Sequence, residues 1–131
     1  MIRLASACLI TYWLAIFVAT HIPSSSMPKL GWSDKVYHII AFSGLSFLLC
    51  WAVPTRLGQR FRQLGVAGGI ALAYAGFDEF TQQFIPGRHC DIWDVAADAV
   101  GICVGISCYL SCHWLLTQVT WGRRLIASFS R

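Results

Sequence analysis

Charged residues are scarce in this chain of 131 residues: they make up 12% of the sequence, whereas hydrophobic residues make up 56%. Soluble domains carry about 25% charged residues, so this composition excludes an ordinary soluble domain and indicates an integral membrane protein. The length predicts a single domain over residues 1–131. The net charge of +4 does not indicate a nucleic-acid partner, because the basic residues lie between apolar runs instead of along one face.

Several sequence signals of known chemistry are also missing. The six cysteines include no C-x-x-C pair, and all but Cys90 lie within apolar runs, where cysteine behaves as a small hydrophobic residue. The sequence contains no serine or cysteine nucleophile elbow, no phosphate-binding glycine-rich loop and no nucleotide fingerprint. These absences argue against disulfide-stabilised and nucleotide-dependent proteins. They leave open whether a cofactor or metal is bound.

Four apolar runs are long enough to cross a bilayer, which needs about 20 helical residues. They predict an all-α polytopic membrane protein with four transmembrane helices in a compact bundle, at about residues 4–20, 35–53, 64–83 and 92–116. The first run could be a signal sequence, but its length and the lack of a clear cleavage site favour a retained helix. Ser33 or Asp34 is expected to cap the second helix, and Pro86 with Gly87 predicts a tight turn after the third.

Basic residues predict the orientation of this bundle, because cytoplasmic loops carry an excess of Lys and Arg. One side of the four-helix topology holds both termini and the basic residues Arg3, Arg56, Arg60, Arg62, Arg123, Arg124 and Arg131. The other side holds Lys29, Lys35 and Arg88, together with all six acidic residues. The sequence therefore predicts a multi-pass membrane protein with both termini in the cytoplasm.

Five of the six acidic residues fall within residues 76–101, where the third predicted helix ends and the fourth begins. Asp91, Asp94 and Asp98 recur at i, i+3 and i+7 and therefore share one face. Charged residues inside spanning helices are costly and usually face a bundle interior or a water-filled cavity. We therefore expect the polar faces of the second, third and fourth helices to meet in one outward-opening cavity.

Two pairs of glycines four residues apart predict places where helices approach each other closely. They are Gly65 with Gly69 and Gly101 with Gly105. We favour ordinary contacts within the bundle over a homodimer interface at both pairs.

The polar residues also carry a family resemblance. The segment SDKVYHIIAFSGLSFLL, followed by DEFTQQFIPGRHCDIWDVAADAVG, resembles the VanZ-like family of bacterial membrane proteins. The matching positions are Lys35, His38, Asp78, Glu79, Gln82, Arg88, Asp94, Asp98 and Gly101. The family is named after a protein associated with low-level teicoplanin resistance. The resemblance therefore implies a protein of the bacterial cytoplasmic (inner) membrane. It also implies a role in the cell envelope of the glycopeptide-resistance type, without fixing a reaction.

Three classes of function stay open, and whether the protein is an enzyme stays open with them. In the first, the protein binds or modifies an envelope lipid, a lipid phosphate or a peptidoglycan precursor. The candidate acid–base groups or metal ligands are Glu79, Asp78, Asp98 and His38, and the candidate binding residues are Lys35, Arg88, Gln82 and Asp94. In the second class, the carboxylates form a relay in a small transporter or proton-coupled protein. In the third, the polar residues only clamp the helices of a structural or accessory subunit.

A polar contact that only holds helices together (a clamp) needs fewer buried acidic residues than a functional site. For Asp91 and Arg88, near the surface, we favour a clamp in which basic groups neutralise carboxylates. For Asp78, Glu79 and Asp98 we favour a functional role, because a clamp does not need three buried acids.

Overall fold

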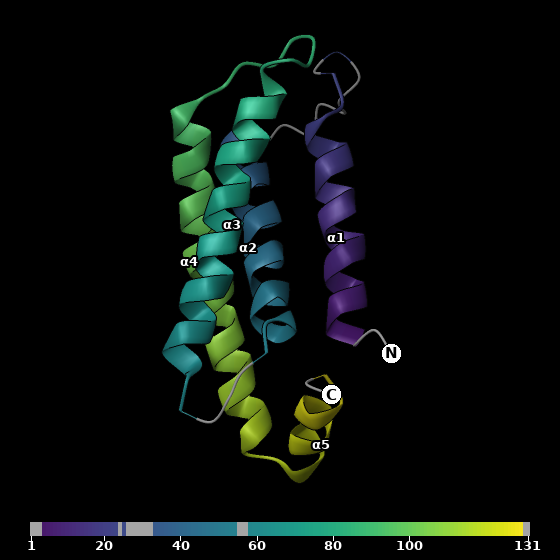
Figure 1. Cartoon of the computed structure of the whole chain (residues 1–131), viewed down its shortest axis with the longest axis vertical. Coiled ribbons are helices and arrows are strands. Elements are labelled where there is room, and N and C mark those ends of the chain that lie inside the picture. The colour runs from purple at the N-terminus through teal and green to yellow at the C-terminus, as the bar shows by residue number, and fades with distance from the viewer. Residues whose placement is uncertain (1–3, 24, 26–32, 55–57, 130–131) are drawn as a thin grey trace.

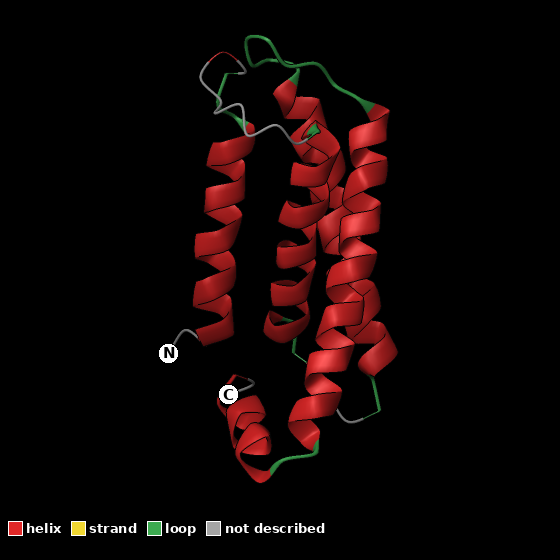
Figure 2. Cartoon of the chain, turned by 180° about the vertical axis from the view of Figure 1, so that it is seen from behind, coloured by secondary structure: helices red, strands yellow, loops and turns green. Residues whose placement is uncertain are grey.

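The computed structural model describes residues 4–23, 25, 33–54 and 58–129, and within these ranges every regular element is an α-helix (Figure 2). The helices are α1 (Leu4–Thr20), α2 (Asp34–Ala52), α3 (Arg60–Gln82), α4 (Ile92–Thr117) and α5 (Thr120–Phe129). The four long helices stand side by side, and α5 lies below α1 at the end of the bundle where α1 begins (Figure 1). The predicted all-α fold is therefore confirmed for the part of the chain that is described.

The predicted helix bounds are close to those observed. The first helix matches, and α2 and α4 differ from the prediction by no more than one residue at either end. Ser33 is the N-cap of α2, but its side chain makes no capping hydrogen bond. α3 begins at Arg60, before the apolar run, because the buried Gln63 side chain donates hydrogen bonds to the carbonyl oxygens of Cys50 and Val53.

The short helix α5 was not predicted, because ten residues with two arginines give no signal for a membrane span. It contacts both α1 and α4. Its large apolar side chains Trp121 and Leu125 are exposed. Hydropathy alone therefore missed an element whose apolar face is narrow.

Two of the described helices, α2 and α4, are long and apolar enough to cross a membrane by length and composition. α1 is apolar but has only 17 residues. α3 has 23 residues, but Arg60 and Arg62 near its start and Asp78 and Glu79 near its end lower its hydropathy. The four-span arrangement therefore stays a prediction.

The distribution of side chains is the reverse of that in a soluble bundle. Large apolar side chains are exposed on each of the four long helices, for example Leu14, Ile40, Leu72 and Val104. By contrast, Asp78, Glu79 and Asp98 are among the largest side chains that are fully buried. The outside of the bundle is thus apolar, while its interior holds carboxyl groups at one end.

At Gly101 and Gly105, α4 lies so close to α2 that neither position has room for a side chain. A Cβ atom on Gly101 or Gly105 would overlap backbone atoms of α2. The hydroxyl groups of Ser43 and Ser46 donate hydrogen bonds across the contact to carbonyl oxygens of α4, at 3.0 and 3.3 Å. The prediction of close packing is confirmed at this pair, whereas Cβ atoms on the pair at residues 65 and 69 would meet nothing within 4 Å.

Candidate functional site

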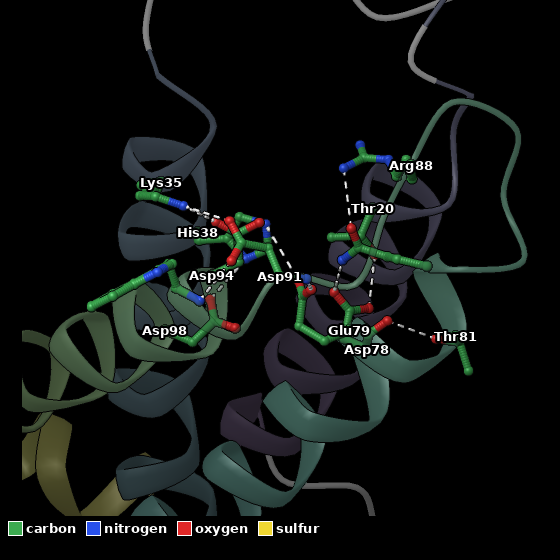
Figure 3. A network of polar contacts seen from close by, with 12 residues as sticks. Thr20, Lys35, His38, Asp78, Glu79, Thr81, Arg88, Asp91, Asp94 and Asp98 are labelled. Atoms are coloured by element: carbon green, nitrogen blue, oxygen red, sulfur yellow. Dashed lines mark hydrogen bonds and ion pairs between the residues drawn. The ribbon is translucent and has the colours of Figure 1, made fainter.

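The candidate site lies at the end of the bundle where α1 and α3 finish and where α2 and α4 begin, which we call the polar end (Figures 1 and 3). Because helices that follow one another in the chain run in opposite directions, residues far apart in the sequence meet there. All eight predicted site residues lie at this end, in three groups of contacts. The predicted residues are Lys35, His38, Asp78, Glu79, Gln82, Arg88, Asp94 and Asp98.

The first group, which we call the rim cluster, consists of Lys35, Asp91 and Asp94. The Lys35 ammonium donates hydrogen bonds to Asp91 Oδ2 at 3.0 Å and to Asp94 Oδ1 at 2.8 Å. Asp91 also caps α4, because its Oδ1 accepts from the backbone N–H of Trp93 at 2.9 Å. That N–H and the Lys35 ammonium together lower the pKa of Asp91. The rim cluster is a charge-compensated contact between α2 and the start of α4.

The second group, which we call the deep cluster, consists of His38, Glu79 and Asp98, one from each of α2, α3 and α4. His38 Nδ1 is 2.9 Å from Asp98 Oδ1, and His38 Nε2 is 3.8 Å from Glu79 Oε1 (Figure 3). Only 4%, 1% and 0% of their surfaces are exposed, respectively. The other oxygen of Glu79, Oε2, accepts from the backbone N–H of Asp91 at 3.0 Å, which links the two clusters.

Two oxygen atoms of the deep cluster are buried without a hydrogen-bond donor in the described part of the chain. They are Glu79 Oε1 and Asp98 Oδ2. An acceptor that loses water and gains no donor costs about 1–3 kcal/mol, and more when it is charged. Most buried polar atoms in proteins have a partner, and the described side chains supply none for these two oxygens.

The third group is centred on Asp78 and connects α1 with α3. Asp78 accepts hydrogen bonds from Thr20 Oγ1 at 2.9 Å, from Gln82 Nε2 at 2.7 Å and from the Tyr74 hydroxyl at 3.3 Å. Gln82 Oε1 in turn accepts from Arg88 at 3.2 Å. Asp78 therefore has donors for both of its oxygens, unlike Glu79 and Asp98.

A tight turn brings Arg88 to the polar end. The backbone N–H of Arg88 donates to the Ile85 carbonyl at 3.1 Å, and Gly87 has a φ of 78°. Only glycine adopts this left-handed conformation readily, as a turn with Pro86 ahead of it requires. The predicted turn is confirmed. It lets Arg88 Nε donate to the Ile22 carbonyl at 3.3 Å, beyond the end of α1.

The sequence did not identify the contribution of α1 to the site. Thr20 contacts Asp78, and His21 lies beside it, with Nε2 3.0 Å from Thr81 Oγ1. The available signal was weak, because α1 has no charged residue and polar residues are common at helix ends. Antiparallel topology alone would have placed Thr20 and His21 at the polar end.

A cavity of about 320 Å³ opens between α1 and α2 at the polar end. Apolar residues form most of its lining, and four polar residues, Thr20, Asp34, His38 and Arg88, also contribute. Two of the predicted site residues, His38 and Arg88, thus reach this cavity. It lies between the first and second helices, whereas the sequence predicted a cavity among the second, third and fourth.

The family comparison covers most of the chain. The model of the VanZ/LLP1 family matches residues 7–116, which include all eight predicted site residues. This chain belongs to the VanZ/LLP1 family. The resemblance seen in the sequence is therefore confirmed. No curated protein and no solved structure matches the chain.

Proposed function

We propose that this VanZ/LLP1 protein spans the bacterial cytoplasmic membrane with its four long helices and binds an anionic envelope lipid at its polar end. The ligand class includes lipid phosphates and lipid-linked cell-wall precursors. Support for the membrane comes from exposed apolar side chains on every long helix, together with two helices that are apolar enough to span. Hydrocarbon accommodates such an exterior, and it tolerates buried carboxyl groups only inside the bundle.

The cavity between α1 and α2 is the observation that carries the lipid proposal. Its apolar lining, which includes Ala15, Ile16, Ala19, Ile40 and Phe42, suits a hydrocarbon chain. Three of its polar lining residues, Thr20, Asp34 and His38, lie where α1 ends and α2 begins, and Arg88 reaches it from the loop between α3 and α4. A lipid has the same division into an apolar chain and a polar headgroup.

Basic groups beside the cavity favour an anionic headgroup. Arg88 lines the cavity, and its planar guanidinium group matches the oxygens of a phosphate. Lys35 lies one helical turn before His38 on α2, with 46% of its side chain exposed. A phosphate at the mouth of the cavity would therefore meet Arg88 directly and have the rim ammonium nearby.

The positions of the basic residues support an outer location for the polar end. Arg60 and Arg62 begin α3, and Arg123 and Arg124 lie in α5, at the opposite end of the bundle from Lys35. The positive-inside rule places these arginines in the cytoplasm. Of the other basic residues used for this prediction, Arg3, Lys29, Arg56 and Arg131 lie outside the described residues.

This orientation is tested with single thiols in a chain whose six native cysteines are replaced by serine. We expect Ser25→Cys to react with a membrane-impermeant maleimide on intact cells, and Gln59→Cys to react only after the cells are opened. The reverse pattern would place the polar end in the cytoplasm and exclude a ligand from the outer leaflet.

A conducting role has less support, because no Asp, Glu or His among the described residues is buried below the deep cluster. Phe42, Leu45, Leu49 and Cys50 of α2 are all at most 3% exposed and pack into the hydrophobic core. The buried polar side chains in this half, Ser46 and Gln63, donate hydrogen bonds to backbone carbonyl oxygens. A relay through the membrane would need a chain of polar groups for protons or ions.

Lipid binding is tested on the purified full chain in a neutral detergent by native mass spectrometry. The probes are undecaprenyl phosphate, phosphatidylglycerol and zwitterionic phosphatidylcholine. Ala19→Phe fills the cavity and should weaken binding of the anionic lipids at least about tenfold, equivalent to 1.4 kcal/mol. Its matched control is Ala96→Phe, at an exposed position of α4 near the same end, which should bind like the wild type. The proposal would be contradicted if Ala19→Phe and Ala96→Phe bound the anionic lipids equally well. It would also be contradicted if the wild type bound phosphatidylcholine as well as the anionic lipids.

A further inference from the structure

The deep cluster gathers two carboxyl groups around a single imidazole in the interior of the bundle. His38, Glu79 and Asp98 each offer a ligand atom, and these atoms lie within 4.8 Å of one another. All three side chains are more than nine-tenths buried. We propose that they bind one divalent transition-metal ion, with His38 Nε2 and Glu79 Oε1 as direct ligands and with Asp98 orienting the imidazole.

The distances in the cluster fit two ligands of one ion better than a hydrogen bond. His38 Nε2 and Glu79 Oε1 are 3.8 Å apart, which is too long for a hydrogen bond. Metal–ligand distances of about 2.0–2.2 Å separate two ligands of one tetrahedral Zn²⁺ ion by about 3.4 Å, so the two atoms lie within a few tenths of an ångström of the spacing that one ion requires. Binding an ion there would break no hydrogen bond between these two side chains.

The hydrogen bond on the other side of the ring fixes the direction of the nitrogen lone pair. Asp98 Oδ1 accepts from the N–H at His38 Nδ1, 2.9 Å away. In a neutral His38 with this tautomer the lone pair resides on Nε2, which lies 3.8 Å from Glu79 Oε1. A carboxylate that holds a metal-binding histidine in this way is a recurring feature of zinc sites.

The two oxygens without donors give the independent reason for an ion. Glu79 Oε1 and Asp98 Oδ2 are buried and have no hydrogen-bond partner among the described residues. The nearest lysine, Lys35, is occupied by the rim cluster at 2.8 and 3.0 Å. A bound cation would satisfy Glu79 Oε1 directly and compensate the charge of Asp98.

A second set of possible ligands is less suitable. Asp34, His38 and Asp94 also place their ligand atoms close together, and they share His38 with the deep cluster. However, Asp94 is already neutralised by Lys35, and Asp34 is exposed. This set serves as the competing outcome of the test.

The donor set indicates which kind of metal binds. Mg²⁺ and Ca²⁺ prefer oxygen ligands alone, whereas imidazole with carboxylate suits Zn²⁺, Mn²⁺ or Fe²⁺. Few protein ligands leave coordination positions free, as in catalytic zinc sites. Because His38 also lines the cavity between α1 and α2, a free coordination position on the ion would lie beside that cavity.

The metal proposal does not depend on lipid binding, and its test uses no lipid.

The experiment measures zinc bound to the purified full chain after treatment with a chelator and dialysis against Zn²⁺. Mass spectrometry of the metal should give about one zinc ion per chain, as a single site with protein ligands requires. Glu79→Gln and His38→Gln should lose this zinc while gel filtration and helical circular dichroism stay unchanged. Asp98→Asn should weaken binding by about 10–100-fold, the usual effect of removing the group that orients a ligand.

The control is Asp34→Asn, which should retain zinc at wild-type affinity. Loss of zinc in Asp34→Asn would assign the ion to the competing set and overturn the proposal. Zinc retained by both Glu79→Gln and His38→Gln would place it elsewhere, for instance on cysteines. Displacement of zinc by millimolar Mg²⁺ would overturn the choice of metal class.

A second measurement covers the case in which the glutamine variants fail to fold. Co²⁺ bound to the wild-type chain should then show the visible absorption of a cobalt ion with nitrogen and oxygen ligands. If this absorption is absent, or if a thiolate charge-transfer band is present, the proposed site is wrong.

Discussion

The rim cluster and the deep cluster contain the same kinds of residue but differ in how their charges are paired. In the rim cluster, one ammonium group contacts both carboxylates, and Lys35 and Asp91 are partly exposed. In the deep cluster, two carboxyl groups share one imidazole, and all three side chains are buried. Of these two clusters, the deep cluster is the one with oxygens that lack a donor among the described residues. The charges of the rim cluster therefore compensate one another, whereas those of the deep cluster do not.

The cost of burying charges explains why this difference matters. Replacing a buried charged pair by apolar residues is often neutral or stabilising, because the charges no longer have to leave water. A buried carboxylate pair with too few donors is thus a poor way to hold helices together. We infer that the deep cluster serves a ligand, while the Asp78 group and the rim cluster hold the surrounding helices in place.

The largest expected effect comes from His38→Leu in metal-free protein. This change leaves Glu79 and Asp98 facing each other without a basic group, and breaking a buried pair in this way costs about 3–5 kcal/mol. The free energy of unfolding is measured by titration with sodium dodecyl sulfate. His89→Leu is the matched control, because His89 is an exposed histidine in the loop between α3 and α4 at the polar end. A loss below about 1 kcal/mol, the range of an exposed pair, would remove the distinction between the two clusters.

A fully apolar deep cluster sharpens the same comparison. The triple variant His38→Leu, Glu79→Leu, Asp98→Leu removes all three polar groups together. It should recover most of the stability lost in His38→Leu, while zinc binding stays absent. If the triple variant is less stable than His38→Leu, the deep cluster is a structural clamp.

The smallest expected effect is the pH dependence of the rim cluster, tested with Asp91→Asn. Asparagine retains the cap of α4 but not the charge. The pKa of Asp91 is lowered in the folded chain by the Trp93 N–H and by Lys35, so its contribution to stability is present above its ordinary pKa of 3.8. This contribution is lost as the pH falls through the lowered folded-state pKa.

The melting temperatures of the wild type and Asp91→Asn should therefore differ near pH 6 and converge under acid conditions. Added salt should reduce the difference, because the pair is exposed. A difference that grows as the pH falls would have the wrong sign for a carboxylate with a lowered pKa.

The sequence by itself determined the class of fold and the end of the bundle where the acidic residues gather. Run length and hydropathy placed the four long helices, because each needs a continuous apolar stretch. Antiparallel connection then put residues 35–38, 78–82 and 94–98 at the same end. The motif around these residues also indicated the family, which the match over residues 7–116 confirms.

Only the tertiary structure decided which base meets which acid. Lys35 and His38 are one helical turn apart, as are Asp94 and Asp98, so the sequence allowed more than one pairing. The close contact at Gly101 fixes the register of α2 against α4, and it pairs Lys35 with Asp94 and His38 with Asp98. A hydrogen bond depends on shifts of less than an ångström between helices, and hydropathy along one chain carries no information about such shifts.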